Sequence, residues 1–555
     1  MYVPAVLAEG RTLYREVWFP YPPAAPYFNS WLFRLFGTHL NTLYWAGCLA
    51  ALGSAVFLFL MGTQLSVSRI GWTAGAVLLL EGFSSTPFSF PLPYSFATVY
   101  ACLTACAFGW VALKTLESTR WYWMFVAGTL AAVAQLLKPE FGLALYLTLC
   151  LTIALRGVRR RCMKSVYRDI AAIAPGIVLC VLTVVWMISI AGVDFITQEN
   201  LMSWPTSYFM KTLGASWLAG TGSPLSVAAF GSALARGVYP ATVLLGLFAV
   251  LRWHRRNGLS RLVRIAIFAA ALGYAVLILN LKPHELIGEL SFPQEMVFYV
   301  ALAAAWYWIL FWRRPADRDV AIPVVLTFAL LLAFRIFFRM GSTEYAIYYN
   351  GPVVLAYLLA VCAVVPKPRP PGHATALVEI VVCLMCLGGI ARDHVTRPKS
   401  QVALSTPRGT VRVYKNLAES YALAIAFMKA KAAEGEMVLS IPEDTSLYFL
   451  SETHCPTRVY QFTPGAVAPG KMTSDTIQEI ERKHVRYLLW SNRTFAEYGV
   501  PVFGKDFNQE LGAYFTSHYR LIGPVAPNHR WRADIWERRP DSPFTGAQHS
   551  RDLGS

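Results

Sequence analysis

Charged side chains are scarce in this chain. Of its 555 residues, 15% are Asp, Glu, Lys or Arg, whereas a soluble domain carries about 25%. Hydrophobic residues make up 55%, so a soluble enzyme of this size could not cover its surface with charge. Disordered, collagen-like and disulfide-rich chains have other compositions. The composition therefore indicates a polytopic membrane protein.

Acidic residues are especially few. The 32 Asp and Glu stand against 49 Lys and Arg, which gives a net charge of +17. In a membrane protein such a basic excess lies in cytoplasmic loops, so we expect no nucleic-acid partner. Most of the ten cysteines lie within apolar runs, and no pair of them stands in the context of a metal site. We expect no cofactor, and the need for a divalent metal stays open.

Long apolar runs recur from residue 43 to 391, each able to cross a hydrocarbon layer about 30 Å thick. They predict twelve spans, at 43–63, 68–83, 94–114, 121–137, 139–156, 169–191, 237–253, 262–280, 293–312, 319–338, 344–365 and 374–391. The fourth and fifth meet at Lys138, which we interpret as a tight turn between two helices; one kinked helix is the alternative. The predicted fold class is a polytopic α-helical membrane protein with a C-terminal extracytoplasmic α/β domain.

Lys and Arg gather in alternate loops. The loop at 156–168 holds five Arg and one Lys, whereas 83–93 holds neither. Basic loops face the cytoplasm, which places residues 1–42 and 392–555 outside it. The predicted domains are a first external loop (1–42), a transmembrane domain (43–391) and an extracytoplasmic α/β domain (392–555). Within the last we expect helices at 413–433 and 474–483 and strands at 437–441, 485–490, 519–522 and 533–538.

The first loop begins without a preceding span or signal peptide. We therefore expect the chain to start late, at an internal methionine, after a first helix. Residues 27–40 (YFNSWLFRLFGTHL) predict a short aromatic-rich helix lying on the outer leaflet; ordinary interfacial aromatics before a span are the alternative. A second surface helix is predicted near 204–217.

Ionisable groups at membrane depth are costly and mark candidate sites. Glu81 and Lys138 end apolar spans at which a neutral residue would cost less. The other candidates on the external side are Glu9, Glu16, Glu140, Lys282, His284, Glu285, Glu289, Arg335 and Arg339. Glu140, His284, Glu289 and Arg339 also suit plain solvated or helix-end roles. Because nearly all of these groups lie at the outer ends of spans, they indicate a site at the outer interface rather than a midplane pathway.

Several segments of the first loop follow a known order. Residues 2–10 (YVPAVLAEG), 13–17 (LYREV), 21–26 (YPPAAP) and 35–37 (LFG) together resemble the opening of polytopic GT-C glycosyltransferases, the group of protein mannosyltransferases and the bacterial aminoarabinose transferase. Residues 136–139 (LLKP) and 345–352 (YAIYYNGP) are similar to two later segments of that family. The family acid lies just before the position of Tyr2, and the aminoarabinose branch has Lys where this chain has Tyr21.

The resemblance implies transfer of a sugar, with inversion, from a polyprenyl-phosphate donor to a lipid, glycan or protein acceptor. It implies a bacterial inner (plasma) membrane location, with the bilayer as a further partner. The family's general base is the acid that this sequence lacks before Tyr2, so we expect another carboxylate to serve. Glu16 matches the acidic position of a later first-loop segment of the family, and Glu81 is the second choice. We expect the donor phosphate at Lys138, Lys282, His284 and Arg339, and substrate-lining side chains at Tyr21, Glu285 and Tyr345.

Two other function classes stay open. A lipid-sugar transporter or flippase would show internal repeats and midplane charges, and the sequence has no such repeat. A non-catalytic GT-C-like membrane scaffold would bind partners through its external tail.

Overall fold

The computed structural model describes residues 1–83, 88–200, 208–216, 226–228, 231, 293–313, 320–334, 347–364, 401–526, 531–542 and 544. Contacts divide the chain into two units. One comprises Met1–Leu43, Thr183–Thr221 and Arg397–Ser555, and the other comprises Tyr44–Leu182 and Gly222–Thr396. We call them the loop–tail unit and the helical unit. The loop–tail unit combines segments from both ends and the middle of the chain.

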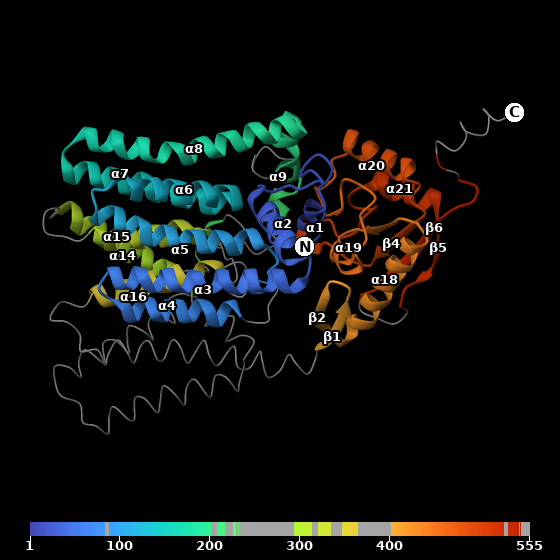
Figure 1. The fold of residues 1–555 in the computed structure, drawn as a ribbon, viewed down its shortest axis with the longest axis horizontal. Helices are drawn as coiled ribbons and strands as arrows, with labels where there is room; N and C mark the ends of the chain where they lie inside the picture. The colour runs from blue at the N-terminus through green and yellow to red at the C-terminus, as the bar shows by residue number, and fades with distance from the viewer. Residues whose placement is uncertain are drawn as a thin grey trace, which may run out of the picture. The chain divides into compact units, whose positions relative to one another are not determined.

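The helical unit is built of apolar helices packed side by side (Figure 1). Along the chain they are α3 (Leu40–Gln64), α4 (Ser68–Gly82), α5 (Phe96–Glu117), α6 (Trp121–Leu137), α7 (Pro139–Arg160), α8 (Met163–Ala191), α14 (Pro293–Arg313), α15 (Ala321–Leu332) and α16 (Ile347–Val364). Among the described residues, α3, α5, α7 and α8 are long and apolar enough to cross a membrane. The chain is a membrane protein. The spans predicted at 237–253, 262–280 and 374–391 lie outside the described residues.

Lys138 separates α6 from α7. Its backbone is extended, with φ −152° and ψ 109°, and it ends one helix and begins the next. Pro139 follows at the first position of α7, where its missing N–H costs no hydrogen bond. The predicted turn is therefore present, and the alternative of one kinked helix is wrong.

Small residues allow α3 and α4 to approach closely. A Cβ built on Gly71 would lie 2.7 Å from the Leu58 carbonyl oxygen and 3.0 Å from the Gly62 Cα. Such contacts between backbones let membrane helices pack without any large side chain between them. The position of α4, and thus of Glu81 near its end, depends on this contact.

Two helices form the start of the loop–tail unit. The first, α1 (Tyr2–Ala8), ends where Arg34 donates hydrogen bonds to the carbonyls of Leu7 (2.7 Å) and Ala8 (3.2 Å). Arg34 belongs to α2 (Ala24–Phe36), the predicted aromatic-rich helix, which begins three residues earlier than 27. Trp31 and Phe36 on α2 are 55% and 67% exposed. Its placement on a leaflet remains a prediction.

The segment after α8 contributes η1 (Phe195–Glu199) and α9 (Tyr208–Thr212) to the same unit. The second surface helix predicted near 204–217 lies partly outside the described residues. The described part of that range contains α9 and a further short helical stretch at 214–216. Phe195 is buried and packs against Tyr14 of the first loop, with ring centroids 4.9 Å apart.

A four-stranded sheet organises the tail, in the order β3–β4–β6–β5. Its strands are β3 (Val438–Ile441), β4 (Tyr487–Ser491), β5 (Tyr519–Pro524) and β6 (Ala533–Arg538), and only β3 and β4 run parallel. The helices are α18 (Lys415–Ala433), α19 (Ser446–Ser451), α20 (Lys471–Arg482) and α21 (Gln509–His518), with the 3-10 turn η5 (Ala496–Tyr498). Parallel pairing requires a crossover, which α19 and α20 supply between β3 and β4.

Sequence periodicity located these four strands to within two residues but missed α19, α21 and a hairpin. A hairpin of β1 (Gln401–Thr406) and β2 (Gly409–Tyr414) precedes α18. The helix predicted from residue 413 therefore begins at Lys415. Along β2, Thr410 and Arg412 alternate with Val411 and Val413, which is the strand period, and this sequence signal could have revealed the hairpin.

Candidate functional site

Glu81 lies at the end of α4 in the helical unit. Its carboxylate accepts a hydrogen bond from the side-chain amide of Asn350, which is fully buried in the first turn of α16. The Asn350 Oδ1 has no hydrogen-bond partner among the described residues. A carboxylate and an amide oxygen are thus held together where α4 ends and α16 begins.

Lys138 lies next to the same helix start. Its Nζ is 3.7 Å from Glu140 Oε1, and its side chain is 13% exposed. The following aromatic residue, Phe141, stacks on Tyr349 with ring centroids 5.0 Å apart. Since Tyr349 adjoins Asn350, the first turn of α16 contacts both the end of α4 and the start of α7. The first turn of α16 is thus shared by the neighbourhoods of Glu81 and Lys138, and a common site for these two residues remains a prediction.

Five of the predicted site residues lie outside the described residues. They are Lys282, His284, Glu285, Arg339 and Tyr345, and their roles remain predictions. Glu289 and Arg335 also lie outside. Tyr21 is described and is half-buried; its carbonyl accepts the Tyr14 hydroxyl at 2.8 Å.

Glu16 belongs to the loop–tail unit, where a tight loop fixes it. The Thr12 backbone N–H donates to Glu16 Oε2 at 2.6 Å. Hydrogen bonds from Thr12, and then the charges of Arg11 and Arg15, lower the pKa of Glu16 below its ordinary value. Glu16 is exposed, so it is an ionised carboxylate open to solvent at neutral pH.

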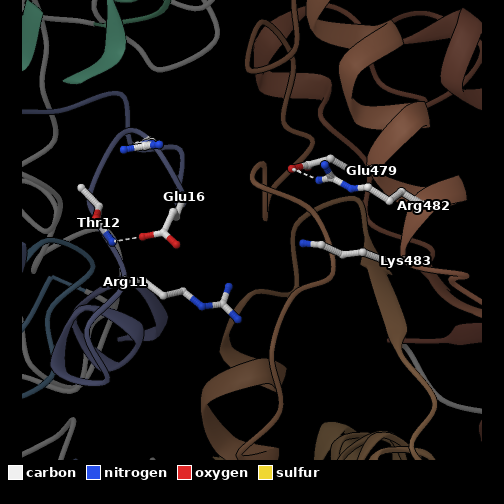
Figure 2. A pocket seen from close by; sticks show the side chains of 7 residues that line it. Arg11, Thr12, Glu16, Glu479, Arg482 and Lys483 are labelled. Carbon is white, nitrogen blue, oxygen red and sulfur yellow. Dashed lines mark hydrogen bonds and ion pairs between the residues drawn. The ribbon is translucent and has the colours of Figure 1, made fainter. Parts of the chain in front are cut away.

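A polar pocket of about 720 Å³ surrounds this carboxylate. Figure 2 shows Arg11, Thr12 and Glu16 on one wall and residues of the tail on the facing wall. Its lining residues are Arg11, Thr12, Arg15, Glu16, Glu479, Arg482 and Lys483. Four cations and two carboxylates thus meet in one hollow, which is suited to hold an anion beside a proton acceptor.

Glu9, another first-loop candidate, has a different environment. Its carboxylate lies 2.6 Å from His454 Nε2 and 4.0 Å from Arg408. These contacts tie the residue after α1 to the tail, and Glu9 does not line the pocket. A structural role is the simplest interpretation of Glu9.

The described residues contain no group of three or more His, Cys, Asp or Glu side chains that could hold a metal ion. The cation-rich wall of the pocket was not predicted from the sequence. Glu479, Arg482 and Lys483 lie more than 460 residues beyond Arg11, and no local pattern links the two segments. The sequence shows the two cations at the end of α20, Arg482 and Lys483, but not that they face the first loop.

No protein-family model and no curated protein sequence matches the chain. Similar solved structures are the Archaeoglobus fulgidus oligosaccharyltransferase in complex with Zn and sulfate (11% identity, TM-score 0.45, covering 88% of this chain and 62% of that one) and ArnT from Cupriavidus metallidurans in the apo state (13%, 0.43, 96% and 92%). The archaeal enzyme tethered to an acceptor peptide with the NVT sequon is also similar (11%, 0.46, 98% and 70%). This chain spans about 62% of the length of the first of these structures.

Proposed function

We propose that this chain is an integral-membrane glycosyltransferase that moves a sugar from a polyprenyl-phosphate donor to an acceptor on the extracytoplasmic face. The observation that carries the proposal is that a carboxylate and a cation lie at the ends of two apolar helices that contact the same helix turn. Asn350 in the first turn of α16 binds Glu81, and Phe141, which follows Lys138 at the start of α7, stacks on Tyr349 in the same turn. The first-loop motifs, which resemble GT-C glycosyltransferases, support the same function.

The proposed reaction needs two kinds of group. A carboxylate takes the proton of an acceptor hydroxyl as that oxygen attacks the anomeric carbon from the face opposite the leaving group. The bond between the anomeric carbon and the phosphate oxygen breaks, and the electron pair leaves on the polyprenyl phosphate. Fixed cations stabilise the negative charge that develops on the phosphate. The configuration at the anomeric carbon is therefore inverted.

Each predicted residue has a place in this scheme. Glu16 and Glu81 are the two candidate bases. Lys138 holds the donor phosphate, together with Lys282, His284 and Arg339. Tyr21, Glu285 and Tyr345 line the substrate cavity. The proposal assigns no cofactor and leaves the need for a divalent metal open.

The test uses the full chain in proteoliposomes with a panel of radiolabelled polyprenyl-phosphate monosaccharides, carrying mannose, glucose or N-acetylglucosamine. Membrane extract supplies acceptors, and release of polyprenyl phosphate and label in product are both measured. Loss of a general base costs about 10²- to 10⁴-fold in rate, so either Glu16→Gln or Glu81→Gln should fall in that range. Lys138→Ala should lower the rate about 100-fold or more. Glu117→Gln removes an exposed carboxylate whose ion pair within the described part of the chain is with Lys114 at 3.9 Å, and it should leave the rate unchanged.

The outcome separates the three function classes. Transport of intact donor across the bilayer without release of polyprenyl phosphate would establish a flippase instead. If the chain binds a polyprenyl-phosphate monosaccharide but releases no polyprenyl phosphate with any donor of the panel, the result would favour a scaffold. Unchanged transfer in all three variants would show that the site lies elsewhere.

A further inference from the structure

The pocket around Glu16 has walls from distant parts of the chain. One wall is the tight loop that contains Arg11 and Arg15, and the other is the end of α20 with Arg482 and Lys483. A cation in the last turn of a helix is favoured by the helix dipole, which accounts for Arg482 without any ligand. The dipole does not account for Arg11 and Arg15, which belong to the facing wall.

The two carboxylates of the pocket leave half of this positive charge uncompensated. Glu16 accepts the Thr12 N–H, and Glu479 accepts the Arg458 N–H at 2.6 Å and lies 3.9 Å from Arg482. Within the part of the chain that the structure describes, neither Arg11 nor Arg15 has a carboxylate within ion-pair distance. Lys483 donates to the Pro456 carbonyl, a neutral group, at 2.5 Å. Four positive and two negative side chains give the lining a net charge of +2.

Arg458 holds the two walls in place. Its Nε donates to the Tyr14 carbonyl at 3.0 Å, and its own carbonyl accepts the Trp18 N–H at 3.0 Å. Its backbone N–H binds Glu479 in α20. One residue thus fixes the loop that carries Arg11 and Arg15 to the helix that carries Arg482. Cations that are held in position before a ligand arrives bind it at a lower entropic cost.

The size and lining of the pocket limit the ligand. Small-molecule sites measure about 300–1,000 Å³, and this pocket is about 720 Å³, which is room for a saccharide. No aromatic or aliphatic residue lines it, so a lipid chain finds no apolar surface there. A phosphate monoester carries about −2 at neutral pH, which equals the excess positive charge.

We propose that this pocket binds a phosphorylated saccharide, with the phosphate on the Arg and Lys side chains and the hydroxyl groups toward Glu16. The inference rests on the proposed function in one respect, which is that the bound saccharide is the acceptor of the transferred sugar. Binding itself needs no donor, so it can be measured whether or not transfer occurs.

The experiment is a calorimetric titration of the full chain in phosphatidylcholine nanodiscs with glucose 6-phosphate, and with glucose as the uncharged counterpart. We expect saturable binding of the phosphate and none of glucose. Removing one charge-assisted hydrogen bond weakens binding roughly ten- to a hundred-fold, so Arg15→Gln and Arg482→Gln should each raise the Kd by that factor. Both arginines are exposed, so their loss leaves the fold intact.

Two further variants sharpen the test. Glu16→Gln keeps an oxygen that can accept the Thr12 N–H and raises the charge of the lining from +2 to +3, so it should tighten binding. Arg520→Gln removes an arginine whose side chain is 57% exposed and which pairs with Glu537 on the sheet; it should leave the Kd unchanged. A merely structural role for Glu16 would not predict tighter binding.

A second arm distinguishes a soluble ligand from a lipid headgroup. Nanodiscs containing phosphatidylinositol 4-phosphate present a phosphorylated ring at the bilayer surface. If this lipid competes with glucose 6-phosphate, the pocket binds a phosphorylated saccharide that is carried by a lipid. If only the free sugar phosphate binds, the ligand is soluble. The proposal is overturned if neither phosphate binds, or if Arg15→Gln and Arg482→Gln bind as the wild type does. If the wild-type chain binds glucose 6-phosphate but transfers no sugar from any polyprenyl-phosphate donor, the proposed function is contradicted and the binding site is not.

Discussion

Removal of one partner from a buried ion pair should strongly destabilise the helical unit. Arg156 in α7 and Asp169 in α8 are 3% and 0% exposed, and the guanidinium contacts both carboxylate oxygens, at 2.8 and 3.2 Å. The same guanidinium donates to the Ser118 carbonyl at 2.8 Å and to the Thr115 carbonyl at the end of α5. Three helices therefore meet on one arginine.

Removing one partner leaves the other charge buried without a counter-ion. Such losses cost about 3–5 kcal/mol, whereas replacing both charges by apolar residues is often close to neutral. We expect Asp169→Ala to lower the free energy of unfolding by about 3–5 kcal/mol. In the double variant Arg156→Leu/Asp169→Leu two carbonyls lose a donor, so we expect a smaller loss of about 1–3 kcal/mol.

The assay is reversible unfolding in mixed micelles by SDS titration, followed by tryptophan fluorescence. Lys114→Ala is the matched control because it breaks an exposed pair, Lys114 with Glu117 at 3.9 Å, and exposed pairs contribute about 0–1 kcal/mol. The reasoning is refuted if Asp169→Ala costs no more than this control, or if the double variant is less stable than the single one.

Three further changes test the packing and the charges elsewhere. Gly71→Ala should destabilise the contact of α3 with α4 by about 1–3 kcal/mol, because its Cβ would overlap backbone atoms; Gly523→Ala, with open space around its Cβ, should be neutral in the same SDS titration. Arg458→Ala removes the side-chain hydrogen bond to the Tyr14 carbonyl and the ion pair with Glu199 at 3.4 Å. Amide hydrogen exchange at residues 10–18 should therefore become faster. Unchanged exchange rates would show that the Arg458 side chain does not hold this loop in place. Burial raises the pKa of Asp444, which Tyr421 and Trp531 hold by hydrogen bonds. The folded chain then takes up a proton at a higher pH than the unfolded chain, so this group adds stability as pH falls from 7 toward 4. Asp444→Asn should flatten that rise in melting temperature, and an unaltered pH profile would contradict the assignment.

The sequence alone determined the class of this protein and the place of most of its elements. Long apolar runs, the shortage of charge and the alternation of basic loops are local properties, readable without any contact between distant residues. The Pro after Lys138 and the short apolar runs of β3 and β4 determine the local backbone within a few residues, so the sequence alone locates these elements. The choice of Glu81 and Lys138 also came from local reasoning, since a charge at the end of an apolar span is costly wherever the span packs.

Tertiary structure decided which of these groups meet. The pocket joins Arg11 to Lys483, Glu81 reaches Asn350, and Arg156 finds Asp169, each across a helix packing or a loop closure that no local pattern encodes. Arg156 illustrates the physical reason. In the sequence it is one more cation of a basic loop, but packing removes it from water, and a buried guanidinium needs a counter-ion and acceptors at fixed distances. Those partners come from whichever helices surround it, and only the fold selects them.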